Sequence, residues 1–473
     1  MGVVTDRPTI QFRMLNRSKG AAMWSPRAQC DKTRFSEEWR QILENTDNLF
    51  IWQDSVTGLL IEENPGFSGD EGGSAKFRIG GVKTKMGVDF SARAVVLTVG
   101  TFLNGLMHVG RSSASGGRAG DPASYGLTEQ LVSLGFESGR MKTGTPARID
   151  IRSVDLSKFQ LQPGDEAPSK FSFLTSIVPL PYEEQLPCYL IHTSQEVHDI
   201  LRSGFSDSPL FDGTIKGIGP RYCPSIEDKL RTFADKSSHQ LFLEPEGRDT
   251  NEYYLNGFSS SLPMDVQVRA LRMIDGFENI HVYRPGYAIE YDYFPPTQLQ
   301  YSLETKLVDG LYFAGQINGT TGYEEAAAQG LMAGINASRK LSGSEPLVLR
   351  RDQAYIGVLI DDLVNKGVDE PYRMFTSRAE YRILLRQDNA DMRLTPIGID
   401  LGLVDGQRAD MFSQKKQLVD SFVDYLRVTS VSPAEILDYL SSIGSSPLPQ
   451  GRKLYDVLLR NDVYLFGLIQ ALD

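Results

Sequence analysis

The residues with the clearest capacity for chemistry lie in the run Gly219-Pro-Arg-Tyr-Cys-Pro-Ser-Ile-Glu-Asp-Lys229. Pro224 suits the first position of a helix, which we expect over Ser225–Lys236, and Cys223 would then be the N-cap. A thiol there lies at the positive end of the helix dipole, and Arg221 adds a nearby positive charge. Both favour the nucleophilic thiolate, although acidic residues in the first turn oppose it in part. An inert buried cysteine is the alternative.

A second candidate is a strand–turn–helix unit at residues 311–340. The run Leu311-Tyr-Phe-Ala-Gly-Gln316 predicts a short apolar strand that ends at Gly315, and a Gly/Thr turn continues to Gly322. Small residues in the first turns of the following helix allow close approach to a sheet or to a flat ligand. The N-terminus of that helix suits a pyrophosphate or the electron-rich pyrimidine edge of a flavin. A plain strand–helix unit with a tight turn is the alternative.

A third candidate is a row of arginines. Arg378, Arg382 and Arg386 recur at four-residue intervals, and Arg373 lies just before them. A helix over Ser377–Gln387 would carry the three on one face. In an acidic protein, such a stripe suits an anionic backbone such as RNA. A solvated or acid-paired helix face is the alternative.

The elements that must position these residues follow from periodicity and turn signals. The buried run before Gly100 ends in Thr-Val-Gly-Thr, the kind of strand end that closes over the adenosine half of FAD in two-dinucleotide flavoproteins. It is the last of five short runs that predict a β-meander: Leu49–Gln53, Gly58–Glu62, Lys76–Ile79, Val82–Lys85 and Ala92–Val99. The C-terminal third predicts helices over Asp352–Asn365, Ser377–Gln387, Gln407–Arg427 and Pro433–Ser442.

Length, charge and cysteine content limit the class of protein. The 473 residues suffice for two or three domains, and a net charge of −11 means that a nucleic-acid partner needs a local basic patch. Three cysteines, Cys30, Cys188 and Cys223, cannot form a disulfide framework and indicate a reducing cytoplasm. Their wide spacing, with no ligand spacing among the histidines, predicts no metal site. The sequence shows no bilayer-length apolar run and no signal peptide, so no membrane association is expected.

Several long blocks together resemble the GidA/MnmG family. They are residues 12–20, 115–122, 142–146, 219–229, 284–292, 313–330 and 371–385. The resemblance, which runs through nearly the whole chain, implies an α/β fold: an FAD/NAD(P)-binding Rossmann-like domain lacking its first βαβ unit, an inserted α/β second domain and an α-helical C-terminal domain. The corresponding ranges are 1–149 with 299–345, then 150–298, then 350–473, the last being an incomplete domain that binds tRNA and the partner protein.

The resemblance also implies an activity. It is the FAD-dependent modification of the tRNA wobble uridine at C5, which forms carboxymethylaminomethyl or aminomethyl uridine together with an MnmE-type GTPase. The implied cofactors are FAD, NAD(H) as the reductant and methylene-tetrahydrofolate as the one-carbon donor. A homodimer, a heterotetramer with the GTPase and a cytoplasmic location are implied as well.

The resemblance also implies roles for individual residues at matching positions. Cys223 matches a cysteine proposed to act in catalysis, and Val56, Ser124 and Gln316 match FAD contacts. The stretch that matches an NAD-binding segment comprises Gly219, Pro220, Arg221, Tyr222, Cys223, Pro224, Ser225, Ile226, Glu227, Asp228, Lys229, Leu230, Arg231, Thr232 and Phe233. The region that matches the tRNA-facing surface holds Arg373, Arg378, Arg382 and Arg386.

The chain also departs from the family pattern. Family members begin with a strand and a Gly-x-Gly-x-x-Gly turn that holds the FAD pyrophosphate, and Met1 lies downstream of both. The family's helical domain extends past the position of Asp473. We therefore expect an enzyme core cut at both ends, with exposed strand edges and poor solubility. The alternatives are an inactive RNA- or partner-binding remnant, or a folate- and FAD-dependent tRNA uridine methyltransferase, which the inserted domain and the long helical C-terminus disfavour.

Overall fold

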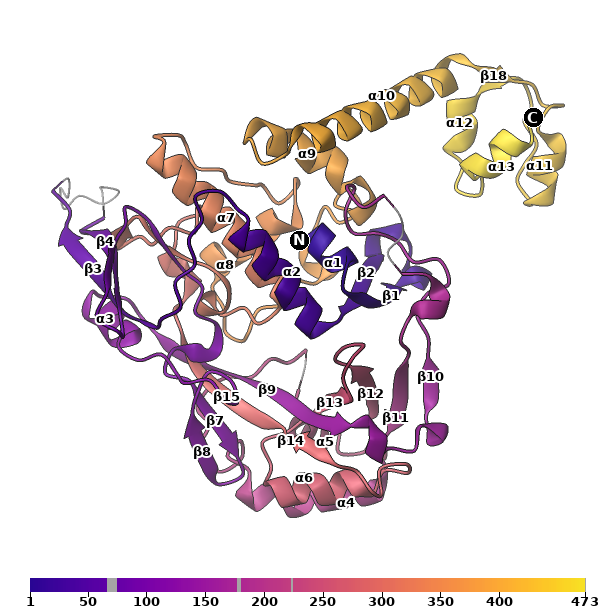
Figure 1. Cartoon of the computed structure of the whole chain (residues 1–473). Coiled ribbons are helices and arrows are strands. Elements are labelled where there is room, and N and C mark those ends of the chain that lie inside the picture. Colours follow the sequence, from indigo (N-terminus) through magenta and orange to yellow (C-terminus); the bar gives the residue numbers. More distant parts are fainter. Residues whose placement is uncertain (66–74, 177–179, 223, 473) are drawn as a thin grey trace. The chain divides into compact units, whose positions relative to one another are not determined.

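The computed structural model describes residues 1–65, 75–176, 180–222 and 224–472. They form two compact units, Met1–Gln387 (unit 1) and Asp388–Asp473 (unit 2), whose elements are labelled in Figure 1. Cys223 lies outside the described residues.

The strand–turn–helix unit at 311–340 forms as the sequence predicts. Strand β17 (Leu311–Phe313) pairs in parallel with β6 (Val95–Leu97), so the two strands expected to border a cofactor are neighbours. Helix α7 (Tyr323–Leu341) packs on both strands. A one-turn 3₁₀ helix, η9 (Gly315–Asn318), connects β17 to the turn before α7, and another, η3 (Gly100–Phe102), follows β6.

Three aromatic rings hold this layer together. Phe313 lies 5.5 Å from Phe136 and 5.6 Å from Phe294, measured between ring centroids. Phe136 follows helix α3 (Leu127–Ser133), and Phe294 follows a long strand of the neighbouring sheet. All three side chains are buried, so segments far apart in sequence meet in one core.

The predicted meander forms in part. Its sheet contains β3 (Val56–Glu63), β4 (Phe77–Thr84), β5 (Asp89–Ser91) and β16 (Val308–Asp309). Its last strand, expected over Ala92–Val99, is β6, which pairs with β17 and lies outside this sheet. The two strands expected between Lys76 and Lys85 are one strand, because Gly81 (φ +147°) sits against the backbone of Phe90 and lets the chain continue through an irregular register. The strand expected over Leu49–Gln53 does not form. Phe50 is 90% exposed, and Trp52 packs edge-on against Phe90 instead of entering a ladder.

A nine-stranded sheet forms the other large part of unit 1. Its order is β10-β11-β12-β13-β9-β15-β7-β8, with β14 also beside β9. The strands are β7 (Leu106–Val109), β8 (Ser112–Ser115), β9 (Gly139–Asp150), β10 (Gln160–Gln162), β11 (Cys188–His192), β12 (Gln240–Pro245), β13 (Glu252–Ser259), β14 (Val282–Arg284) and β15 (Tyr287–Tyr293). Helices α4 (Gln195–Ser203) and α6 (Met264–Arg272) lie side by side along it (Figure 1), and α5 (Ile226–Thr232) packs near β13.

Unit 1 also contains an N-terminal part and helix α8. The N-terminal part contains α1 (Gly2–Asp6), the hairpin β1 (Thr9–Leu15) and β2 (Ser25–Cys30), and α2 (Lys32–Glu44). Helix α8 (Tyr355–Lys366), which the sequence predicts over Asp352–Asn365, packs against α7.

Unit 2 is mainly helical. Its helices are α9 (Ala390–Asp400), α10 (Gly406–Val428), α11 (Leu437–Ser442), α12 (Leu454–Leu458) and α13 (Leu465–Gln470), and a two-stranded ladder joins β18 (Ser430–Val431) to β19 (Arg452–Lys453). The helix predicted over Gln407–Arg427 forms as α10, whereas only the last part of the one predicted over Pro433–Ser442 is helical. Within the described ranges, every helix is too short or too polar to span a bilayer.

The aromatic core predicts a large stability effect. Phe313→Ala should lower the free energy of unfolding of unit 1 by about 3–5 kcal/mol, because a buried ring is removed from between two partners. Urea unfolding followed by circular dichroism measures the change. The matched control is Phe50→Ala, which removes an exposed ring and should cost less than about 0.5 kcal/mol. Equal effects of the two substitutions would contradict the packing of Phe313 in a buried core.

Candidate functional site

A buried amide fixes the turn between β17 and α7. The side-chain oxygen of Gln329, on α7, accepts hydrogen bonds from the backbone N–H of Gly315 (3.1 Å) and from Asn318 Nδ2 (2.8 Å). Its Nε2 donates to Thr320 Oγ1 (3.0 Å), which in turn donates to the Gly315 carbonyl (2.8 Å). All four residues are buried. The turn that carries Gln316 is therefore held by these side-chain hydrogen bonds together with backbone ones, from the Phe294 N–H to the Ile317 carbonyl (2.7 Å) and from the Tyr372 N–H to the Gly319 carbonyl (2.8 Å).

Gln316 lies beside two other segments. A Cβ atom at Gly100 in η3 would come 3.3 Å from Gln316 Oε1, so the amide lies against that backbone. On another side is Tyr291 of β15, a fully buried residue. Burial raises the pKa of Tyr291, and the neighbouring Gln316 offsets the rise in part. The Tyr291 hydroxyl makes no hydrogen bond within the described part of the chain, which leaves a polar atom facing the predicted cofactor contact.

The other two predicted FAD positions lie at the same place. Ser124 Oγ donates to the Val56 carbonyl (3.2 Å), and the Ser124 N–H donates to the carbonyl of Phe102 (2.8 Å) in η3. Because η3 and η9 are in contact, Val56, Ser124 and Gln316 border one small region built by β3, β6 and β17.

The segment that matches an NAD-binding stretch approaches this region from the nine-stranded sheet. The Tyr222 hydroxyl is hydrogen-bonded to Thr321 Oγ1, in the turn before α7. Arg221 Nε forms an ion pair with Glu370 (2.8 Å), and Ile218 bridges to Met141 of β9. The structure therefore brings Tyr222 to the turn before α7, whereas Arg221 reaches Glu370 in the loop after α8.

The helix after Cys223 begins later than the sequence predicts. Helix α5 starts at Ile226 and ends at Thr232, and its N-cap is Ser225, whose hydroxyl accepts from the Asp228 N–H (3.2 Å). The prediction that Cys223 caps this helix is wrong, because a serine hydroxyl is a stronger N-cap acceptor and is available two residues on. The dipole argument for a Cys223 thiolate is lost with it. Elsewhere, burial raises the pKa of the Cys188 thiol to about 11, which keeps that thiol protonated at neutral pH.

The start of α7 carries a carboxylate that sequence reasoning missed. Glu325 is 4% exposed, accepts from the Met374 N–H (2.8 Å) and forms an ion pair with Arg373 (3.2 Å). The positive end of the α7 dipole therefore already has a counter-charge. Glu325 and Gln329 are polar residues four apart on a helix face of small residues, and that pattern was the available signal for both.

The arginine stripe does not form. Residues 377–387 contain the 3₁₀ turn η10 (Thr376–Arg378) and further turns instead of the predicted helix. Ala379 and Leu385 are buried in a small cluster with Val358 of α8. These contacts hold the segment in turns, so the arginines do not share one helix face. Tertiary contacts thus override the local periodicity.

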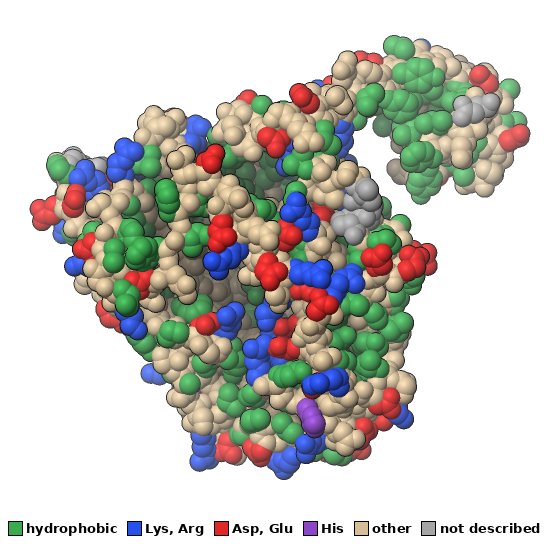
Figure 2. All heavy atoms as spheres, viewed as in Figure 1, with side chains coloured by type: hydrophobic (Ala, Val, Ile, Leu, Met, Phe, Trp, Pro, Cys, Tyr) green, Lys and Arg blue, Asp and Glu red, His purple; other side chains and the backbone are tan. Residues whose placement is uncertain are grey.

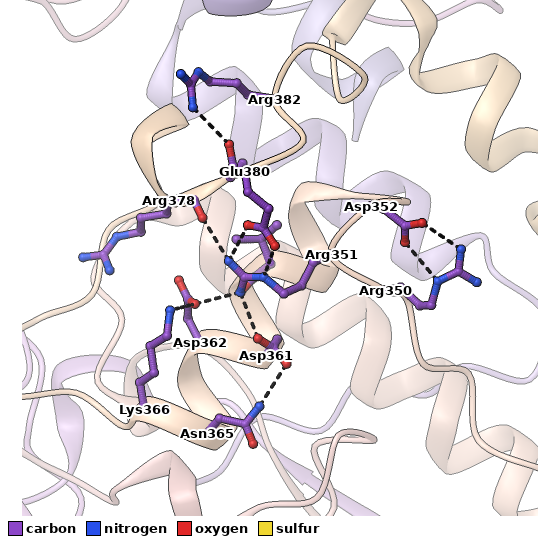
Figure 3. Close-up of polar contacts among 12 residues, drawn as sticks. Arg350, Arg351, Asp352, Asp361, Asp362, Asn365, Lys366, Arg378, Glu380 and Arg382 are labelled. Carbon is purple, nitrogen blue, oxygen red and sulfur yellow. Dashed lines mark hydrogen bonds and ion pairs between the residues drawn. The ribbon is translucent and has the colours of Figure 1, made fainter.

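Arg351 is the hub of those contacts (Figure 3). It donates to both oxygens of Glu380 (2.8 Å each) and to the Arg378 carbonyl (3.0 Å), and it also reaches Asp361 (2.9 Å) and Asp362 (2.8 Å). The Arg351 guanidinium lowers the pKa of Glu380 to about 2. The chain around residue 380 is therefore tied to α8.

The four candidate tRNA contacts end in different places. Arg373 lies beside Glu325, next to Tyr372, whose N–H donates to the Gly319 carbonyl (2.8 Å). Arg378 stacks 4.4 Å above the Tyr372 ring. Arg382 is exposed, lies 3.5 Å from the Ala379 carbonyl and points toward Glu380 (Figure 3), and Arg386 donates to the Ile383 carbonyl (3.3 Å). Figure 2 shows Lys, Arg, Asp and Glu side chains gathered beside a hollow on the viewed face.

The residues of this region fit a flat ligand with polar edges. Gly100 and Gly315 adopt positive φ values (+61° and +86°), so the backbone approaches closely without side chains in the way. The unpartnered Tyr291 hydroxyl and the Gln316 amide supply polar contacts. Among the residues that the structure describes, no group of three His, Cys, Asp or Glu side chains could hold a metal ion.

Comparison with known proteins places the chain. It is 56% identical over 469 residues to the tRNA uridine 5-carboxymethylaminomethyl modification enzyme MnmG of Flavobacterium johnsoniae, covering 99% of this chain and 73% of that relative. The MnmG of Parabacteroides distasonis is 58% identical, with 99% and 72% covered. A crystal structure of Aquifex aeolicus GidA superposes with a TM-score of 0.88 at 43% identity, over 99% of this chain and 72% of that one, which confirms the predicted fold class. Residues 1–345 match the family model described as glucose inhibited division protein A, and the chain therefore belongs to the GidA family.

Proposed function

We propose that this chain is a flavin-dependent enzyme that modifies the wobble uridine of tRNA at C5, forming carboxymethylaminomethyl or aminomethyl uridine. The GidA family is flavin-dependent and modifies tRNA. The observation that carries the proposal is that Gln316 lies against Gly100 of η3, to which the Ser124 backbone is also hydrogen-bonded through Phe102, while Tyr222 reaches the turn before α7. The matched relatives bear the MnmG name over 99% of this chain, which favours this activity over uridine methylation.

The positions of these residues suggest what each would do for a bound flavin. When bound, FAD supplies a ring that accepts and donates electrons. Gln316 and the Tyr291 hydroxyl would hold its polar edge, with Val56 and Ser124 contacting it further along. The chain's own part is to keep this region rigid, through the Gln329 hydrogen bonds, and to cover it with Tyr222.

The segment Gly219–Phe233 is the proposed site for NAD(H), the reductant, and Cys223 is the proposed nucleophile. Tyr222, the residue just before Cys223, reaches the turn before α7, which supports placing this chemistry beside the flavin. Methylene-tetrahydrofolate is proposed as the one-carbon donor, because the product carries a new carbon at C5.

Arg373, Arg378, Arg382 and Arg386 are the proposed tRNA contacts, now as separate cations rather than one stripe. Arg382 is the most accessible of them, and Arg373 adjoins the turn at Gln316. An MnmE-type GTPase is the proposed partner, with a homodimer and a heterotetramer as the assemblies. The cytoplasm, where tRNA is modified and thiols stay reduced, is the proposed location.

Substitution of the proposed nucleophile tests the activity. The chain, supplied with FAD, NADH, methylene-tetrahydrofolate and the GTPase, should modify unmodified tRNA, and Cys223→Ser should abolish the modification without weakening tRNA binding. Mass spectrometry of tRNA nucleosides and a filter-binding assay measure the two effects. Cys188→Ser, at a buried thiol held protonated, is the matched control and should stay active. Full activity of Cys223→Ser rules out its role.

Charge reversal tests the tRNA contacts. Arg378→Glu with Arg382→Glu should weaken tRNA binding and reduce the slope of log affinity against log salt by about 1 for each phosphate that is no longer neutralised. Titration at several salt concentrations measures the slope. Arg269→Glu, at an exposed arginine of α6, is the control for a change in overall charge. An unchanged slope in the double variant would show that these side chains are merely solvated.

A further inference from the structure

A buried carboxylate anchors the segment that leads to Cys223. Glu290 Oε1 accepts hydrogen bonds from the backbone N–H groups of Lys216 (2.9 Å) and Gly217 (2.8 Å). Its other oxygen is paired with His108 Nε2 (3.0 Å). Glu290 is 4% exposed and His108 is 2% exposed. A carboxylate this deeply buried is costly unless hydrogen bonds satisfy it, and here both of its oxygens have partners.

The sheet register places these groups. Strand β15 lies between β7 and β9, and Glu290 is opposite Leu106 on one side and Lys142 on the other. His108 is two residues along from Leu106, so it lies diagonally across the same sheet face. Packing alone would be served by an apolar side chain in the middle of a sheet. The carboxylate instead directs one oxygen to a loop and the other to a histidine.

From Glu290 the segment runs to the proposed flavin site. A Cβ atom at Gly217 would lie 2.7 Å from the Met141 backbone carbon, so the chain there is pressed against β9. The Lys142 N–H then donates to the Ile218 carbonyl (3.0 Å), and Tyr222 ends the run at Thr321. Within the described residues, Glu290 is the side chain that holds the backbone N–H groups of Lys216 and Gly217.

A second buried carboxylate holds the chain after Cys223. Glu227, on α5, is 0% exposed, and its Oε1 accepts from the N–H (2.6 Å) and hydroxyl (3.0 Å) of Ser261. The chain is therefore tied to the nine-stranded sheet and its neighbouring loop on both sides of position 223. Of the two anchors, Glu290 alone has a titratable partner.

We propose that Glu290 is a positioning residue, which with His108 holds Lys216–Tyr222 against β9 so that Tyr222 reaches Thr321 in the turn before α7. The inference rests on the proposed function and deepens it. It makes the geometry of the catalytic segment depend on a carboxylate that touches neither substrate nor cofactor.

The charged groups around the pair set the direction of its pH dependence. Burial alone would raise the pKa of Glu290, but His108, the two backbone N–H groups and Arg140 outweigh it and lower the pKa. The Asp212 carboxylate also interacts with His108 from a neighbouring loop. Because the pKa of Glu290 is lower in the folded protein, the anchor is complete at neutral pH and is lost as pH falls through the folded-state pKa.

Two substitutions at one position test the role. Glu290→Met keeps the length and removes the acceptors, so amide hydrogen exchange over 216–222 should speed up by about tenfold or more. The modification kcat should fall by a similar factor, with the KM for tRNA little changed. Glu290→Gln retains an acceptor oxygen, so it should restore much of both at neutral pH and flatten the acid limb of the kcat profile. Glu252→Met, at an ion-paired residue of β13, is the control and should leave exchange over 216–222 unchanged.

The readouts separate this inference from the proposed function. Hydrogen exchange is measured on the free protein and needs no reaction, so faster exchange confined to 216–222 supports the anchor even if tRNA is not modified. Unchanged exchange over 216–222 in Glu290→Met would overturn the proposal. So would exchange that rises equally across the whole sheet, since that would show a loss of general stability only.

Discussion

The hydrogen bonds of the Gln329 side chain are the constraint on which the site depends. One buried amide joins the end of β17, the 3₁₀ turn and the loop before α7, and it adds to the backbone hydrogen bonds that Phe294 and Tyr372 make to the same turn. Because Gln329 lies on a helix packed against β6 and β17, its hydrogen bonds hold the turn against the hydrophobic core. A buried amide without these partners would be costly, so the turn and the helix stabilise each other.

Three distant parts of the chain then converge on the fixed turn. Tyr222 arrives from the nine-stranded sheet, the loop with Ser124 closes over η3, and the stretch after α8 joins through Tyr372 and Arg373. Charged side chains hold two of these segments. Glu290 holds the segment that contains Tyr222, and Glu325 with Arg351 holds the stretch after α8. Charged side chains at the bases of these loops fix the positions of the polar side chains that the loops carry. The large apolar cores supply most of the stability.

The sequence was most informative where the signal was local. The apolar run at Leu311–Phe313, the glycines after it and the small residues of α7 predicted these elements, and the structure adds that β17 pairs with β6. Prediction failed where two local interpretations competed or where distant contacts decided. Pro224 led to Cys223 as the expected cap, and the folded chain shows that Ser225 caps the helix by accepting from Asp228. The four-residue spacing from Arg378 to Arg386 resembled a helix, but Arg351 and the burial of Ala379 draw that segment into turns. The Glu290 pair joins residues 182 apart in sequence, which no local pattern can indicate.

FAD binding to the chain and to Gln329→Met tests most directly whether the Gln329 hydrogen bonds hold a flavin site. Titration followed by flavin fluorescence and absorbance should show binding by the unaltered chain. Affinity should fall by about tenfold or more in Gln329→Met, which keeps side-chain length but removes the hydrogen bonds. Gln407→Met, at an exposed residue of α10, should bind as the unaltered chain does, and circular dichroism should show all three folded. A folded chain without flavin binding, or a Gln329→Met variant that binds FAD as tightly as the unaltered chain, would contradict a flavin site fixed by Gln329.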